Sequence, residues 1–150
     1  AGLLDRALRT LDIDDADRER ARQSAKDVFL VEYTDGLRAA VVNCDEVVAN
    51  WGIAARGPQH EMACRIWLQP HPHGHFIFMV RQIESMLLNG AAPYPVERTL
   101  LTTGMLDAAM RSRHDGGARR PTPELAIAYQ PVDRVPDTGI SLPISAAPTV

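Results

Sequence analysis

The sequence predicts an α+β domain, with an open, mostly antiparallel sheet and two helices packed on one face of that sheet. Three observations lead to this fold class. The 150 residues are 45% hydrophobic and 23% charged, which is the composition of one globular domain. Apolar and polar residues alternate between residues 27 and 69, as in strands, whereas apolar residues after residue 76 recur at helical spacing. The expected element order is ββββααβ.

The first 26 residues, 1–26, are expected to form a charged leader or linker outside the sheet. Four leucines and an alanine recur there at helical spacing, which predicts a short amphipathic helix. They are Leu3, Leu4, Ala7, Leu8 and Leu11. The next stretch, residues 12–26, is polar on every side, so we interpret it as a solvated helix or a mobile linker, with a docking element as the less favoured alternative.

A β-hairpin is expected at the start of the central domain, residues 27–130. The strands 27–34 and 37–43 flank Asp35 and Gly36, a pair of residues that strongly favours a two-residue hairpin turn. The length of such a turn sets the register of the two strands. The expected cross-strand pairs are Tyr33 with Arg38, Val31 with Ala40, and Phe29 with Val42.

Two more strands, 46–56 and 62–69, are expected to extend this hairpin into a four-stranded antiparallel meander. Gly57 and Pro58 supply the turn residues between them. One face of the first of these strands is apolar and consists of Val47, Ala49, Trp51, Ile53 and Ala55. Both faces of that strand look apolar, and two helices cover only one face of a sheet. The uncovered face therefore requires a partner, which is another domain, another subunit or the amino-terminal helix.

Two helices and a short strand complete the predicted domain. The helix over 76–89 carries an apolar stripe and is followed by Gly90, which suits a left-handed cap. The stripe consists of Phe76, Met79, Val80, Ile83, Met86 and Leu87. A second helix is expected over 97–113, and a closing strand over 125–129. Residues 131–150 contain four prolines and are expected to form an extended tail.

Three closely spaced histidines, His71, His73 and His75, are the candidate metal ligands. Neutral imidazoles bind zinc, copper and nickel. A metal site usually needs further ligands on rigid elements, and no spacing singles one out. The further candidates are His60, Asp45, Glu61 and Glu84. The other interpretation is a polar turn that leads from a strand into the helix over 76–89.

Motifs for catalysis and cofactor binding are absent from the sequence. It contains no Gly-x-Ser-x-Gly, no Gly-x-Gly-x-x-Gly and no Gly-x-x-x-x-Gly-Lys. Cys44 and Cys64 lie within strand patterns, where cysteine commonly acts as a small hydrophobic residue. We therefore assign no catalytic residue and no cofactor-binding residue to these 150 residues.

Charge and hydropathy argue against two classes of partner. The net charge of −3 disfavours a nucleic-acid partner. No apolar run exceeds five residues, so no membrane span is expected. The two cysteines, and the lack of a basic segment followed by an apolar run at the start, predict a cytoplasmic location.

The central domain also contains several segments whose sequences are similar to those of known proteins. They are residues 32–39, 82–90 and 92–106, Ser112, and residues 122–129. These segments resemble the carboxy-terminal domain of the Gfo/Idh/MocA family, whose members are similar to glucose–fructose oxidoreductase and inositol 2-dehydrogenase. The resemblance covers about residues 27–130 and is most specific in the helix over 97–113.

The resemblance implies a two-domain protein. In this family an amino-terminal Rossmann domain holds NAD or NADP, and the α+β domain shapes the substrate site and forms oligomers through its open sheet. The family's Glu-Lys-Pro with its catalytic lysine, its glycine-rich fingerprint and its Asp-x-x-x-His segment have no match here. No catalytic residue is therefore carried over.

Three functions remain open from the sequence. We expect the chain to be a fragment of a longer NAD(P)-dependent oxidoreductase-like protein, neither catalytic nor cofactor-binding by itself. Its partners are then a homo-oligomer through the open sheet face or a missing Rossmann domain. The alternative is a free-standing, non-catalytic dimerisation or ligand-binding module. A third possibility is a small metalloprotein that uses His71, His73 and His75.

Overall fold

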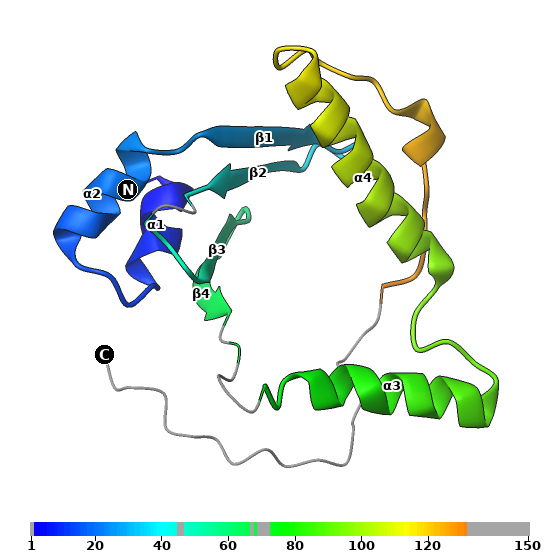
Figure 1. Cartoon of the computed structure of the whole chain (residues 1–150). Coiled ribbons are helices and arrows are strands. Elements are labelled where there is room, and N and C mark those ends of the chain that lie inside the picture. The colour runs from blue at the N-terminus through cyan, green and yellow to red at the C-terminus, as the bar shows by residue number, and fades with distance from the viewer. Residues whose placement is uncertain (1, 45–46, 67, 69–72, 132–150) are drawn as a thin grey trace. The chain divides into compact units, whose positions relative to one another are not determined.

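The computed structural model describes residues 2–44, 47–66, 68 and 73–131. These residues form four α-helices, a short 3₁₀-helix and four strands (Figure 1), which confirms the α+β class. By its internal contacts the chain divides into two compact units, Ala1–Leu68 and Gln69–Val150. This division differs from the predicted boundaries after residues 26 and 130.

Two short helices open unit 1 and supply most of its core. Helix α1 spans Leu3–Arg9, as the leucine spacing predicted, and α2 spans Asp15–Gln23. Asp14 caps α2, because its carboxylate accepts a hydrogen bond from the backbone N–H of Asp17 at 2.7 Å. Four buried residues cluster together: Leu8, Leu11, Ala21 and Cys44. The segment predicted as a charged leader therefore provides three of the four buried residues in the described part of the chain.

Strands β1 (Asp27–Glu32) and β2 (Arg38–Asn43) form the predicted antiparallel hairpin, but the predicted register is wrong by one residue. The observed pairs include Glu32 with Arg38, Val31 with Ala39, and Phe29 with Val41. The N–H of Gly36 donates to the carbonyl oxygen of Tyr33 at 3.1 Å, and the φ angle of Gly36 is 90°. The connection is therefore a three-residue loop with a bulge glycine, which adds one residue to the predicted turn.

Strands β3 (Trp51–Arg56) and β4 (Glu61–Ile66) form a second antiparallel hairpin. Its first strand starts later than predicted. Before it, the carbonyl oxygen of Cys44 accepts hydrogen bonds from the N–H groups of Val47 and Val48, each at 2.9 Å, so the chain turns locally there. The two hairpins are separate two-stranded sheets in the described residues, and a single four-stranded sheet is not confirmed.

Helix α1 packs on one face of the β3–β4 hairpin, which we call the inner face. The residues of this face are Gly52, Ala54, Arg56, Glu61, Ala63 and Arg65. A Cβ atom at Gly52 would lie 2.5 Å from the carbonyl oxygen of Ala7 and 3.1 Å from the hydroxyl oxygen of Thr10. Since real Cβ atoms do not approach a backbone oxygen so closely, only glycine permits this contact between strand and helix.

Unit 2 contains both helices that the sequence predicted. Helix α3 spans Phe76–Asn89 and α4 spans Val96–His114. Gly90 ends α3 in the left-handed conformation, with a φ angle of 66°, as predicted. Pro95 precedes α4, and Glu97 in its first turn complements the helix dipole.

A 3₁₀-helix, η1 (Pro123–Leu125), packs on α4 where the sequence predicted the start of a closing strand. The side chain of Leu125 fills the space beside Gly104 that a Cβ atom would otherwise occupy. The N–H of Leu125 donates to the carbonyl oxygen of Thr122 at 2.9 Å. The N–H of Ile127 donates to the carbonyl oxygen of Leu125 at 2.7 Å. These local hydrogen bonds occupy backbone donors of this segment, and the predicted strand is not confirmed.

Two remaining predictions concern the membrane and the tail. Of the helices in the described ranges, none combines the length and the apolar character that crossing a bilayer requires. The tail predicted over 131–150 lies outside the described residues from residue 132 onwards.

The contact at Gly52 generates a stability prediction. We expect Gly52→Ala to lower the free energy of unfolding by about 1–3 kcal/mol, because the added methyl group forces α1 away from the strand. Gly57→Ala is the matched control. A Cβ atom there would meet its nearest neighbour at an ordinary 3.7 Å, so its unfolding free energy should stay close to that of the wild type. Urea denaturation measures both, and equal midpoints for the two variants would contradict the packing described here.

Candidate functional site

The face of the β3–β4 hairpin that points away from α1 is apolar and exposed, and we call it the outer face. Its six residues are Trp51, Ile53, Ala55, Met62, Cys64 and Ile66. The exposed fractions of its large residues are 58% for Trp51, 45% for Ile53, 59% for Met62 and 38% for Ile66. None of the six carries a charge. The outer face is therefore a candidate surface for association with another polypeptide.

Strand alternation and the pairing register bring these side chains together. Residues two apart point to the same side of a strand, and directly paired residues share a face. The pairs are Trp51 with Ile66, Ile53 with Cys64, and Ala55 with Met62. Ile53 and Cys64 thus form the central pair of the outer face.

Sequence reasoning found half of the outer face. It placed Trp51, Ile53 and Ala55 on one apolar face, and the structure confirms this grouping. The predicted extension of the face to Val47 and Ala49 is wrong, because β3 begins only at Trp51. The half contributed by β4 was missed, although Met62, Cys64 and Ile66 follow the same alternation in the sequence.

Ion pairs hold α1 on the inner face. The carboxylate of Glu61 pairs with Arg6 of α1 at 2.5 Å and with its cross-strand neighbour Arg56. The hydrogen bond from Arg56 lowers the pKa of Glu61 below its ordinary value. Asp5 of α1 pairs with Arg22 of α2 at 2.5 Å, and the hydrogen bond from Arg22 lowers the pKa of Asp5. With α1 fixed in this way, the outer face is the side of the hairpin that stays open.

Helix α3 carries a second exposed apolar surface, which belongs to unit 2. The predicted stripe is exposed along its whole length. Its residues are Phe76, Met79, Val80, Ile83, Met86 and Leu87. No residue of α3 is buried, and the exposed side chain of Leu88 continues the apolar surface outside the stripe. The two units therefore each expose an apolar surface formed by regular secondary structure.

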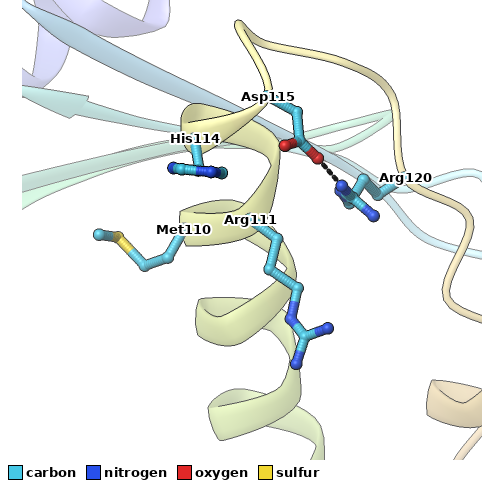
Figure 2. Close-up of a pocket in the computed structure, with 5 residues that line it drawn as sticks. All are labelled: Met110, Arg111, His114, Asp115 and Arg120. Carbon is cyan, nitrogen blue, oxygen red and sulfur yellow. Dashed lines mark ion pairs between the residues drawn. The ribbon is translucent and has the colours of Figure 1, made fainter.

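A surface depression lies at the carboxyl end of α4 (Figure 2). It is lined by Met110, Arg111, His114, Asp115 and Arg120. Arg120 forms an ion pair with Asp115, and Arg111, which points along the helix away from that pair, contacts Asp107 at 2.9 Å. Both guanidinium groups are thus already paired, and no hydroxyl or thiol group lines the depression. Basic side chains at this end of a helix are explained by the helix dipole, so we assign no reactive site here.

The histidine-rich turn is only partly within the described residues, since His71 lies outside them. His73 adopts a φ angle of 63°, and its ring centroid lies 6.1 Å from that of His75. The ring of His75 packs on Phe76 at a centroid distance of 4.4 Å, at the start of α3. Among the residues that the structure describes, no three His, Cys, Asp or Glu side chains are grouped to hold a metal ion. Metal binding by the three histidines stays a prediction.

Comparison with known proteins adds no relative. No protein-family model matches the chain. Neither the curated proteins nor the solved structures give a match. The resemblance to the Gfo/Idh/MocA family therefore stays a prediction from the sequence.

The ion pairs of Glu61 generate a prediction about pH. Because the pKa of Glu61 is lowered in the folded chain, its ion pairs stabilise the fold above its ordinary value of 4.5 and lose that effect as the pH falls through the lowered value. We expect Glu61→Gln to lower the midpoint of urea denaturation at neutral pH, and the difference from the wild type to disappear in acid.

Asp107→Asn provides the control for this measurement. Asp107 pairs with Arg111 within α4, where both side chains are exposed, so its removal should shift the midpoint little at any pH. A Glu61→Gln variant as stable as the wild type at neutral pH would show that these ion pairs do not hold α1.

Proposed function

We propose that this chain is the substrate-site and oligomerisation domain of an NAD(P)-dependent oxidoreductase-like protein, and that it is not catalytic by itself. The observation that supports this proposal best is the outer face, an uncharged surface of six residues whose four large side chains are exposed. The oxidoreductase part of the proposal rests on the sequence resemblance alone. A cytoplasmic location belongs to the same proposal.

The physical basis is the cost of leaving large apolar side chains in water. Burying apolar surface contributes roughly 25 cal/mol per Å². The exposed apolar area of the outer face is on the order of 400 Å². A stable protein interface buries about 800 Å² per partner. Association through the outer face alone should therefore be weak and concentration-dependent, and a second domain would supply the remaining area.

The proposal includes the arrangement predicted from the sequence, an open sheet in ββββααβ order with both helices on one face. In the Gfo/Idh/MocA family, the corresponding domain forms oligomers through its open sheet and lies beside the domain that holds the cofactor. An uncovered apolar strand face is what such an arrangement requires of this chain. The partner is then a second copy of the chain, a Rossmann domain, or both.

The described residues do not fit a nicotinamide dinucleotide. The pyrophosphate of that cofactor binds at a helix amino terminus, where free N–H groups and the helix dipole attract an anion. Three of the four α-helices carry acidic residues in their first turn: Asp5 in α1, Asp15 and Asp17 in α2, and Glu97 in α4. Negative charge at these positions repels a phosphate, and α3 follows a histidine-rich turn rather than a glycine-rich one. The proposal therefore places the cofactor on another domain.

An alternative is a free-standing, non-catalytic dimerisation or ligand-binding module. The same outer face supports it, because a module of this kind also needs an uncovered apolar surface. The two functions differ in the length of the native protein, since a Rossmann domain would add roughly 120–200 residues.

The native length is the first test of the proposal. We expect an immunoblot of the source cells, with serum raised against these 150 residues, to show a band of about twice the 16.5 kDa of this chain or more. The chain itself, run in the neighbouring lane, serves as the size standard. A native band at 16.5 kDa would exclude the fragment and leave the free-standing module or the small metalloprotein.

The cofactor assignment has its own test. Isothermal titration of the 150-residue chain with NADH and with NADPH should give no saturable binding, because three of the four α-helices carry acidic residues in their first turn and α3 follows no glycine-rich turn. A nicotinamide-dependent dehydrogenase of known activity, titrated under the same conditions, checks the ligand stocks. Saturable binding to this chain alone would contradict the proposal that another domain binds the cofactor.

Association through the outer face is tested by introducing a charged side chain into that face. We expect the wild-type chain to shift from monomer to dimer in sedimentation experiments as its concentration rises. Ile53→Lys should weaken this association at least about tenfold, because a lysine at the centre of the face leaves a charge against apolar surface. Thr99→Lys is the control, since it adds the same charge at an exposed polar position of α4, outside the strands, and should leave association unchanged.

Cys64 provides a second measure of the same association. Its thiol is exposed in the described residues, whereas that of Cys44 is buried, so a maleimide should modify Cys64 first. The rate of modification should fall with rising concentration of wild-type chain and stay constant for Ile53→Lys. A wild-type chain that stays monomeric would exclude self-association and leave another domain as the partner.

A further inference from the structure

We draw no further inference here: the strongest candidate, the exposed apolar stripe along α3 (Phe76, Met79, Val80, Ile83, Met86 and Leu87), is an unpartnered helix face, and nothing in the described part of the chain shows what covers it.

Discussion

The close contact between Gly52 and the end of α1 is the constraint on which the arrangement of unit 1 depends. A two-stranded hairpin is marginal in water and needs another element packed on one of its faces. Because Gly52 has no Cβ atom, the carbonyl oxygen of Ala7 can lie where a larger residue would collide with it. The neighbouring inner-face residues Ala54 and Ala63 are also small, so the face suits the backbone of a helix. The part of the inner face around Gly52 is therefore covered by the chain itself.

Charge fixes α1 in this position and also explains why the start of the chain was predicted to be a charged leader or linker. Asp5 joins α1 to α2 through Arg22, and Glu61 joins α1 to the hairpin through Arg6. These charged residues make the segment look solvated in the sequence. Its contribution to the core comes from uncharged residues that lie between the charged ones. Ala21 is fully buried, and its carbonyl oxygen accepts a hydrogen bond from the Cys44 thiol at 3.4 Å. One alanine in a polar helix gives no periodic signal.

Local signals in the sequence were sufficient for most elements, whereas long-range pairing was not predictable from them. The apolar stripe and Gly90 located α3 correctly, because helix periodicity and a left-handed cap are properties of neighbouring residues. Asp35 and Gly36 located the first hairpin, but the same two residues suit a two-residue or a three-residue loop, so the register was wrong. The closing strand was predicted over 125–129, while local backbone hydrogen bonds around Leu125 form a 3₁₀-helix at its start.

The two faces of the β3–β4 hairpin differ in a way that bears on what can cover each of them. The inner face admits a helix backbone beside Gly52, because Gly52, Ala54 and Ala63 are small. The outer face carries Trp51, Ile53 and Met62, whose long side chains stand away from the strand and keep a helix backbone at a distance. Side chains of this size pack best against another set of side chains, as between two facing sheets about 10 Å apart. A partner with an apolar surface of its own would suit the outer face, and the proposed oligomerisation would bring such a surface to it.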